Sequence, residues 1–390
     1  MRITFLVDNL PHPTLPLLTE HGLSMYIDQI TPNSSLLTPT SILCDMGASG
    51  AYIKNAKALG IDLDTCHWAF LSHAHADHTG GLGKWVAQHG HIPVYASHRI
   101  ATDEYFSSRP KRVEGQKSKV ESQCKVTDES FNRVIDESLT IQRERSEQIN
   151  DSTSKRERSE FNSPHHQRTD EYEVRIITAS PDRSDLRYIG PDLNLFHGHT
   201  PWFKPIEQNT WLTPHIALVH PTCNLYPKPL GNKYLTVVEG LCKVTDESYN
   251  RLIDEPLTIQ RERSEQINDS AIQPKRSEND PFLHEIALCF VTPKGLVIVS
   301  CCSHHGALNT IASCMEFTGC NTLHAYIGGL HFVDSPQVEA ETTSFINDWL
   351  TRYPNAHLYT GHCTCPRAAT LLKAHLPHCH TFYTGNVIEV

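Results

Sequence analysis

Short apolar segments alternate with amphipathic ones in two stretches of the 390-residue chain. In the first stretch, up to about residue 100, apolar and partly β-branched runs predict strands. These strands are expected at 2–7, 24–30, 41–46, 67–73 and 93–97, and helices are expected at 51–60 and 80–90. Glycine stands at the end of the first of these helices and at the start of the second, and it is common at helix boundaries.

The second stretch, from about 281 to 390, shows the same alternation. Residues 285–292 and 295–301 read as strands, and Pro293-Lys294-Gly295 between them predicts a hairpin. Further strands are expected at 322–329, at 357–361 and at the C-terminal end, with helices at 306–318, 337–352 and 366–375. Such alternation is typical of a parallel sheet with helices outside it.

The middle of the chain has a different composition. Residues 1–100 carry 12 Asp, Glu, Lys and Arg side chains, whereas residues 101–170 carry 27. A segment so charged and so poor in large apolar residues cannot bury enough surface to offset its ordering entropy. Strand-like pieces at 173–179 and 215–220 predict that the chain returns to the folded core between 171 and 235.

The middle also contains a repeat. Residues 124–152 recur at 242–270 with three differences. Two copies separated by unrelated sequence cannot stack as the units of a solenoid do. The copies could be a pair of docking helices, but their composition favours a duplicated surface insertion with no part in the chemistry.

Charge and hydropathy exclude several classes of protein. The formal net charge of −10 argues against binding to a phosphate backbone. No run of 18 apolar residues is present, so no membrane span is expected. Asp8 interrupts the N-terminal apolar run too early for a secretory signal, which predicts a cytoplasmic protein. The 13 cysteines are scattered and are expected to be buried thiols rather than disulfides.

Histidines outnumber glycines, 25 to 20, and they cluster at one place. His73, His75, Asp77 and His78 lie within six residues, directly after a predicted strand and before a predicted helix. Sites of α/β proteins lie at such strand ends. A solvated histidine-rich tract is the alternative, but a tract would be repetitive and flanked by polar residues.

This spacing suits two metal ions. His73 and His75 are two residues apart and can share one ion, whereas Asp77 and His78 suit a second ion beside it. Imidazole with carboxylate favours zinc, with manganese or iron as alternatives, over magnesium or calcium.

The motif His-x-His-x-Asp-His at a strand end resembles the signature of the metallo-β-lactamase superfamily. Within it, the chain is most similar to the group typified by 7,8-dihydropterin-6-yl-methyl-4-(β-D-ribofuranosyl)aminobenzene-5′-phosphate synthase. The segments that carry this resemblance are 7–9, 20–24, 44–47, 302–306 with Asn309, 327–331 and 361–364.

The resemblance implies a fold and a domain organisation. The fold is an α/β four-layer αββα sandwich, with a metal site on the rim between the two sheets. The whole chain, 1–390, would be a single domain. Residues 101–170 and 240–280 would be insertions in it, poorly ordered or helical.

The resemblance also implies six metal ligands for two ions. His73, His75, Asp77 and His78 match the family motif, His362 matches its last histidine, and His304 follows a strand where a further ligand is expected. Asp77 would also be catalytic, because it would orient the attacking nucleophile. Many members have a bridging aspartate where this chain has Cys301 and Cys302, so Cys302, His304 or solvent is expected to bridge the ions.

Four other residues are expected near the ligands. His331 is interpreted as a substrate contact or as a support behind the ligands, with a plain buried histidine as the alternative. His284 and Glu285 fall where the family often has an acidic pair. Asp45 is expected to anchor the site loop by hydrogen bonds rather than to bind metal.

The predicted function is that of a dinuclear metal-dependent enzyme acting on a small phosphate-bearing or pterin-like substrate. A synthase of this kind transfers a dihydropterin methyl carbon to an aminobenzene partner with loss of pyrophosphate. One alternative is hydrolysis of a phosphodiester, ester or thioester, which would need the same ligands. Another is a catalytically silent metal-binding interaction protein. The sequence leaves the oligomeric state open.

Overall fold

A computed structural model describes residues 1–28, 40–108, 187–198, 200–238 and 279–390 of the chain. All of these residues belong to one unit, which comprises Met1–Arg109 and Ile177–Val390. Most of the two predicted insertions, the first repeat copy, the second copy and the predicted strand at 173–179 lie outside the described residues.

The first sheet has seven strands in the order β17-β1-β2-β3-β4-β5-β8. Its centre runs antiparallel from β1 to β3 and then parallel from β3 to β8. β17 pairs antiparallel with β1, so the last strand of the chain completes the first sheet. The strands are β1 (Arg2–Val7), β2 (Ser24–Asp28), β3 (Ser41–Cys44), β4 (Trp68–Phe70), β5 (Val94–Ser97), β8 (Phe203–Ile206) and β17 (Val387–Glu389).

The second sheet also has seven strands, in the order β16-β15-β14-β13-β12-β10-β9. β12 and β13 form the predicted hairpin, and β13 to β16 run parallel. The strands are β9 (Thr210–Thr213), β10 (Ile216–Val219), β12 (Ala287–Thr292), β13 (Gly295–Val299), β14 (Leu323–Ile327), β15 (His357–Thr360) and β16 (Cys379–Thr381).

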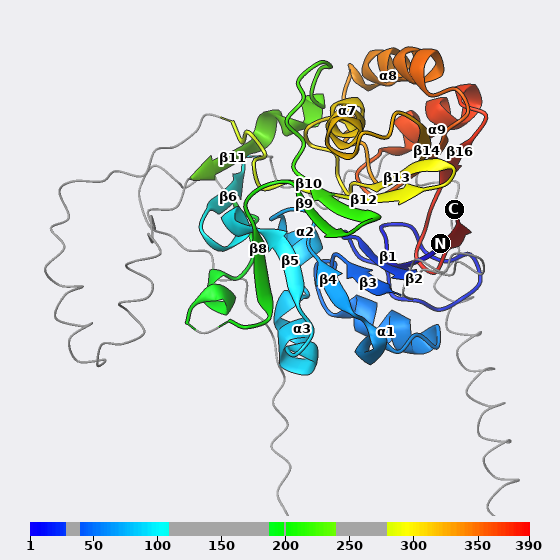
Figure 1. The fold of residues 1–390 in the computed structure, drawn as a ribbon. Coiled ribbons are helices and arrows are strands. Elements are labelled where there is room, and N and C mark those ends of the chain that lie inside the picture. Colours follow the sequence, from blue (N-terminus) through cyan, green and yellow to red (C-terminus); the bar gives the residue numbers. More distant parts are fainter. Residues whose placement is uncertain (29–39, 109–186, 199, 239–278) are drawn as a thin grey trace, which may run out of the picture. The chain divides into compact units, whose positions relative to one another are not determined.

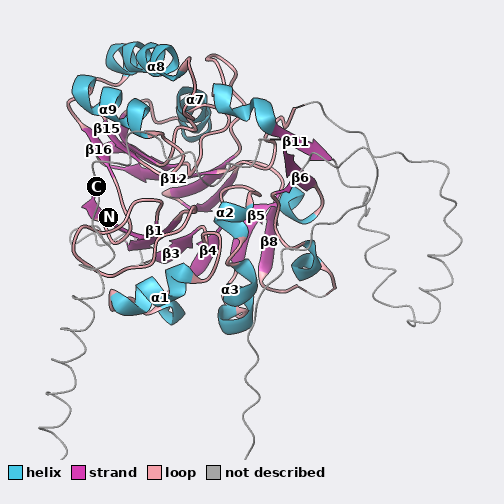
Figure 2. Cartoon of the chain, turned by 180° about the vertical axis from the view of Figure 1, so that it is seen from behind, coloured by secondary structure: helices cyan, strands magenta, loops and turns pink. Residues whose placement is uncertain are grey.

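The two sheets face each other, and helices cover their outer faces (Figures 1 and 2). On the first sheet lie α1 (Ala51–Ala58) and α3 (Leu82–His89). On the second lie α7 (Ala307–Thr318), α8 (Val338–Arg352) and α9 (Pro366–His375). This is a four-layer αββα sandwich, so the predicted fold class is confirmed.

Alternation along the strands builds this layering. Ile42 of β3 lies in the core between the sheets, whereas its neighbour Leu43 lies in the core under α1 and α3. Val297 and Ile298 of β13 divide in the same way between the inner core and the core under α7 to α9. Strands buried on both faces explain why the sequence shows continuous apolar runs rather than apolar–polar alternation.

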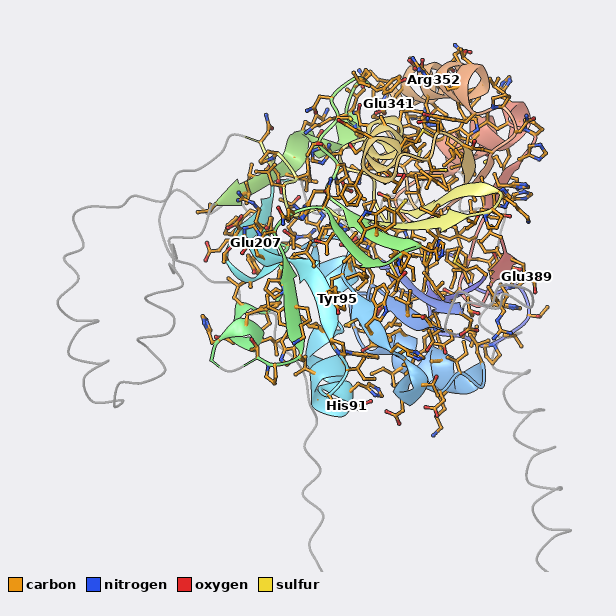
Figure 3. The ribbon with its side chains drawn as sticks, in the orientation of Figure 1. His91, Tyr95, Glu207, Glu341, Arg352 and Glu389 are labelled. Carbon is orange, nitrogen blue, oxygen red and sulfur yellow. The ribbon has the colours of Figure 1, made fainter. Side chains whose placement is uncertain are left out.

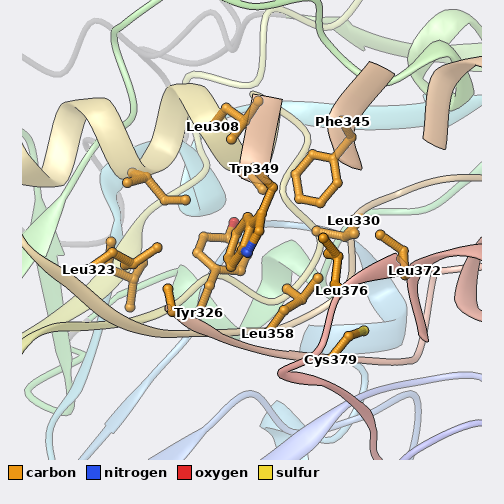
Figure 4. Close-up of a cluster of buried hydrophobic side chains, with 14 of the residues drawn as sticks. Leu308, Leu323, Tyr326, Leu330, Phe345, Trp349, Leu358, Leu372, Leu376 and Cys379 are labelled. Carbon is orange, nitrogen blue, oxygen red and sulfur yellow. The ribbon is translucent and has the colours of Figure 1, made fainter. Parts of the chain in front are cut away.

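The helices bury one face each. In α8, Val338, Thr342, Phe345, Ile346 and Trp349 are buried, a spacing that keeps them on one side of the helix. Figure 4 shows Phe345 and Trp349 among the sheet side chains that include Tyr326 and Leu358.

Three features differ from the sequence-based expectation. Both large sheets are mixed rather than parallel, because neighbouring strands from β1 to β3 and from β9 to β13 pair antiparallel. The C-terminal end contains two strands, β16 and β17, one in each sheet. A third sheet, β11-β6-β7, was not predicted; its strands are β6 (Glu104–Ser107), β7 (Arg187–Tyr188) and β11 (Leu235–Val238).

Two expectations from composition can be compared with the described residues. Of the 13 cysteines, the 11 in the described part of the chain are free thiols, and most of them are buried. Among the same residues, no helix combines the length and the apolar character needed to cross a bilayer.

Candidate metal centre

The His73–His78 motif forms a tight turn at the end of β4. His75 precedes a single helical turn, α2 (Ala76–Thr79). The backbone N–H of Leu23 donates to the carbonyl of Asp77 (3.1 Å), and that of Met46 donates to the carbonyl of His78 (2.8 Å). The motif is therefore fixed to the loop that precedes β2 and to the loop that follows β3.

Glycines let these loops approach. A Cβ atom on Gly80 would lie 2.3 Å from the carbonyl oxygen of Ala48, and one on Gly22 would lie 2.7 Å from that of Asp77. Real Cβ atoms do not approach backbone so closely, so the spacing of the loops requires glycine at both positions.

The first ligand set consists of His73, His75 and His304. Their ring centroids lie 4.7 to 4.9 Å apart, and one nitrogen of each lies within 4.8 Å of the others. All three Nε2 atoms are buried and have no hydrogen-bond partner among the described residues. Buried polar atoms without partners are costly, so three of them facing one point fit a bound cation.

Burial also sets the charge state of this set. Burial, and then the neighbouring histidine His284, lower the pKa of His75 to about 3. Burial likewise holds the pKa values of His73 and His304 well below the ordinary value. The three imidazoles are therefore neutral at pH 7, which is the form that binds a metal ion.

The second ligand set consists of Asp77, His78 and His362. The Nε2 atoms of His78 and His362 are 3.0 Å apart, and Asp77 Oδ2 lies 3.8 and 3.5 Å from them. Burial lowers the pKa of His362, but the Asp77 carboxylate outweighs it and raises that pKa to about 9. Burial raises the pKa of Asp77, but His78 and His362 outweigh it and hold that pKa well below its usual range.

Cys302 lies between the two sets. Its Sγ is 3.1 Å from Nε2 of His78, and it groups with His73 and His78 on one side and with His362 and Cys363 on the other. This place between the two sets agrees with the expectation that Cys302 could bridge the ions. Burial raises the pKa of its thiol well above the ordinary value, so cations would have to displace its proton before the sulfur could ligate.

Polar side chains orient the other ring nitrogen of four ligands. Asp45 Oδ2 lies 2.6 Å from Nδ1 of His78, and Ser72 Oγ lies 2.8 Å from Nδ1 of His73. Oδ1 of Asn9 lies 3.2 Å from Nδ1 of His362, and Oδ1 of Asn232 lies 3.1 Å from Nδ1 of His304. Partners of this kind fix the tautomer, so that Nε2 presents its lone pair to a metal ion.

Asp45 is fully engaged. Besides His78, its two oxygens accept hydrogen bonds from the backbone N–H and the hydroxyl of Ser72, both at 2.7 Å. Asp45 also has a positive φ of 56°, as do the site residues Ser303, His331 and His362 at 51° to 58°. Non-glycine residues rarely adopt this conformation, and such strain concentrates at functional sites.

His284 and Glu285 lie beside the ligands and serve the backbone. Nδ1 of His284 accepts from the N–H of Ala74 (3.1 Å), and its Nε2 lies 3.1 Å from a carboxylate oxygen of Asp280. Both ring nitrogens are therefore used within the protein. The two oxygens of Glu285 accept from the N–H groups of His304 and His305, at 2.7 and 2.8 Å.

His331 packs on His304, with ring centroids 4.3 Å apart. Neither of its buried ring nitrogens has a hydrogen-bond partner among the described residues. It forms a third group of potential ligands with Cys302 and His304. The structure thus brings all the predicted site residues to one region, six of them as the two ligand sets.

Sequence reasoning missed several residues of this region: His21, Cys363, Asn9 and Asn232. Three of them lie in segments that carry the family resemblance, Asn9 in 7–9, His21 in 20–24 and Cys363 in 361–364, so the signal was present. Nε2 of His21 lies 3.5 Å from Asp77 Oδ2. Asn232 had no sequence signal, because it lies 72 residues from the His304 that it orients.

Comparisons with known proteins agree with the fold. The sequence profile described as the metallo-β-lactamase superfamily matches residues 32–144. The solved structure of Tm1679, described as a metal-dependent hydrolase of the β-lactamase superfamily, aligns over 100% of this chain and 99% of its own. Its TM-score is 0.58 and its sequence identity is 21%, so it supports the fold alone. The profile match confirms the predicted resemblance to the metallo-β-lactamase superfamily over residues 32–144, and the shared fold agrees with it.

Within the superfamily, the chain is similar to a named enzyme. It is 38% identical over 80 residues to 7,8-dihydropterin-6-methyl-4-(β-D-ribofuranosyl)-aminobenzene-5′-phosphate synthase from Methanocaldococcus jannaschii. The matched residues are 20% of this chain and 26% of that protein, so the chain spans about a quarter of the length of this curated relative.

Proposed function

We propose that this protein is a dinuclear metal-dependent enzyme that joins a dihydropterin methyl carbon to an aminobenzene riboside phosphate. The bond from that carbon to the pyrophosphate oxygen breaks, a bond from the carbon to the amine nitrogen forms, and the amine loses a proton. The observation that carries the proposal is the convergence of two ligand sets from both halves of the chain.

The donor atoms fit two divalent transition-metal ions. Five imidazoles with one carboxylate and a nearby thiol suit zinc first, and manganese or iron next. His73, His75 and His304 would hold one ion, and Asp77, His78 and His362 the other. Two such ions supply concentrated positive charge, which stabilises a departing pyrophosphate or lowers the pKa of water.

Asp77 is the residue of the second set that reaches solvent. Its side chain is 23% exposed, whereas those of His78 and His362 are fully buried. An ionised carboxylate at this edge can accept a hydrogen bond from the amine or water that attacks, and so orient it. The exposed His21, 3.5 Å away, can take the released proton toward solvent.

Local similarity to the synthase, 38% identical over 80 residues, supports the substrate class. Hydrolysis of a phosphodiester, ester or thioester would use the same ligands, and therefore the ligands do not choose between the two reactions. A silent metal-binding protein would not need Asp77 at the solvent edge. We also propose that the chain is a single domain whose insertions, at about 101–170 and 240–280, leave the centre intact.

A substrate screen tests this proposal. Metal-loaded protein would receive a dihydropterin pyrophosphate with its aminobenzene riboside phosphate partner, and separately a phosphodiester, an ester and a thioester. Pyrophosphate release that requires both partners supports the synthase. Turnover of a phosphodiester, an ester or a thioester alone would contradict the synthase and support a hydrolase. No turnover with two ions bound would support a catalytically silent metal-binding protein.

A further inference from the structure

A cavity of about 220 Å³ lies beside the metal centre, on the helical side of the second sheet. Its walls are the loop Tyr226 to Leu230, the start of α7 at Gly306 to Leu308, and the face of α8 from Gln337 to Asp348. Glu341 of α8, which lines this cavity, is labelled in Figure 3. Nothing in the metal chemistry described above uses it.

The cavity wall includes residues next to the ligand region in the chain: Gly306 follows His304 by two positions, and Phe332 follows His331. The loop that forms one wall continues to Asn232, whose side chain lies 3.1 Å from Nδ1 of His304. A Cβ atom on Gly231 would lie 2.8 Å from the ring of His331, which packs on His304. Phe332, the neighbour of His331, lines the cavity. A molecule in the cavity would therefore lie next to the centre.

Most of the lining is flat and apolar. Tyr226, Phe332 and Phe345 contribute aromatic rings, and Pro227 and Pro229 contribute flat aliphatic ones. Aromatic and proline rings favour a planar ligand between them, because stacked faces exclude water from a large contact area. A cavity of roughly 150 Å³ holds a benzene ring, so about 220 Å³ accommodates a ring system of one or two fused rings but not a whole nucleotide-sized substrate.

The polar groups of the cavity include two carboxylates, together with the Lys228 ammonium, the Gln337 amide and the Ser344 hydroxyl. Oε1 of Glu341 accepts from the N–H of Leu230 (2.8 Å), whereas Oε2 is buried and has no hydrogen-bond partner among the described residues. Asp348 adds a second carboxylate. The Lys228 ammonium donates instead to the carbonyl of Pro281 (3.4 Å). Two carboxylates disfavour a phosphate and favour a ligand that donates N–H groups.

We infer that this cavity binds the nitrogen heterocycle of the substrate, an aminopyrimidine-type ring whose N–H edge faces Glu341. A planar ring with an amino group next to a ring N–H offers two donors side by side, which is the pattern that a carboxylate accepts best. This inference rests on the proposed function for the identity of the substrate. It adds the site that selects one half of that substrate.

Fluorescence anisotropy tests the inference without turnover. The probe is 6-methylpterin, added to the full-length, metal-loaded chain, and 6-methyllumazine is the matched ring in which a carbonyl replaces the 2-amino group. We expect 6-methylpterin to bind more tightly than 6-methyllumazine. We expect Glu341→Gln to weaken pterin binding by about tenfold or more, since it removes a charge-assisted hydrogen bond.

Two further variants complete the design. Glu339→Gln, two residues away on an exposed face of α8, serves as the control and should leave binding unchanged. Ser344→Trp adds an indole at an exposed position of the cavity lining and should block the ring without disturbing the core. Circular dichroism and metal content would show that each variant is folded and loaded.

The outcomes separate this inference from the proposed function. Weaker pterin binding in E341Q and S344W, but not in E339Q, supports the cavity as the ring site. Unchanged binding in both cavity variants, or no pterin binding by the parent chain, overturns it. The proposed function fails separately, if the parent chain with two bound ions releases no pyrophosphate from the paired substrates.

Discussion

The two halves of the chain build the metal centre in different ways. The first half supplies four ligands within six residues, His73 to His78, on one turn fixed by backbone hydrogen bonds. The second half supplies single residues, His304 and His362, each on its own loop after a parallel strand. Each of these two needs a distant orienting partner, Asn232 or Asn9. A local motif carries its own geometry, whereas isolated ligands depend on the whole fold.

The largest effect is expected for the motif. Asp77→Ala should reduce turnover by about a thousandfold or more, because it removes both an ion ligand and the carboxylate that orients the attacking group. Elemental analysis should show a fall from about two ions per chain toward one. Asp64→Ala, which removes an exposed carboxylate elsewhere in the first half, is the control. Normal activity in the Asp77 variant would mean that the site is misassigned.

The next prediction compares two buried histidines of the second half. His304→Ala should lose one ion, because it removes the third ligand of the first set, whose Nε2 faces His73 and His75. His284→Ala should keep both ions but lose about 1–3 kcal/mol of unfolding free energy, because it leaves Asp280 and the Ala74 N–H without their partner. Metal content and urea unfolding measure the two effects. The reverse result would exchange the roles of these residues.

Orienting residues should have smaller effects. Asn232→Ala and Asn9→Ala should each lower the affinity for one ion by roughly 10- to 100-fold, as loss of such partners typically does. Competition with a chelator measures these affinities. The two variants should lower the affinity for different ions, since Asn232 contacts His304 and Asn9 contacts His362. If neither variant changes affinity, isolated ligands do not depend on distant partners.

The two ligand sets should also differ in pH dependence. Without metal, His362 is protonated at pH 7, because its pKa is about 9, and binding of the second ion must displace that proton. Affinity for this ion should therefore rise nearly tenfold per pH unit as pH increases from about 6 toward about 9. The first set includes His75, whose pKa is about 3, and should bind without releasing a proton. Calorimetry in buffers of different ionisation enthalpy counts the protons.

The smallest effect is expected outside the centre. Deletion of residues 124–152 should leave the metal content unchanged, as a duplicated surface insertion would. Deletion of the second copy, 242–270, provides the matched comparison. Loss of ions from either deletion variant would favour the docking-helix alternative or a structural role. It would also mean that the metal centre depends on the insertions.

Much of the fold was readable from the sequence, because each strand and helix has a local signature. Residues 2–7 were predicted as a strand and form β1 with the same ends, and residues 366–375 form α9. Strand direction was not readable, since apolar runs do not show whether a neighbour is parallel. The short strands β6, β7 and β11 were missed because their pairing joins segments far apart in sequence.

The site residues also divide into those with a local signature and those that depend on distant contacts. His73 to His78 were found from their spacing alone, and His304 and His362 were found through the family resemblance. Asn9 lies in a segment that carries the resemblance but was given no role, and Asn232 was not found, because both asparagines act here only through tertiary contacts. The roles of His284 and Glu285 also depend on such contacts, which turn both residues toward the backbone rather than the ions.

X-ray absorption of the zinc-loaded protein tests most directly that both halves enclose two neighbouring ions. We predict imidazole nitrogen at about 2.0–2.1 Å, and a second zinc at about 3.5–4 Å from the first. Sulfur at about 2.3 Å would in addition identify Cys302 as a ligand. A spectrum with no zinc–zinc contribution at two ions per chain would contradict the shared centre.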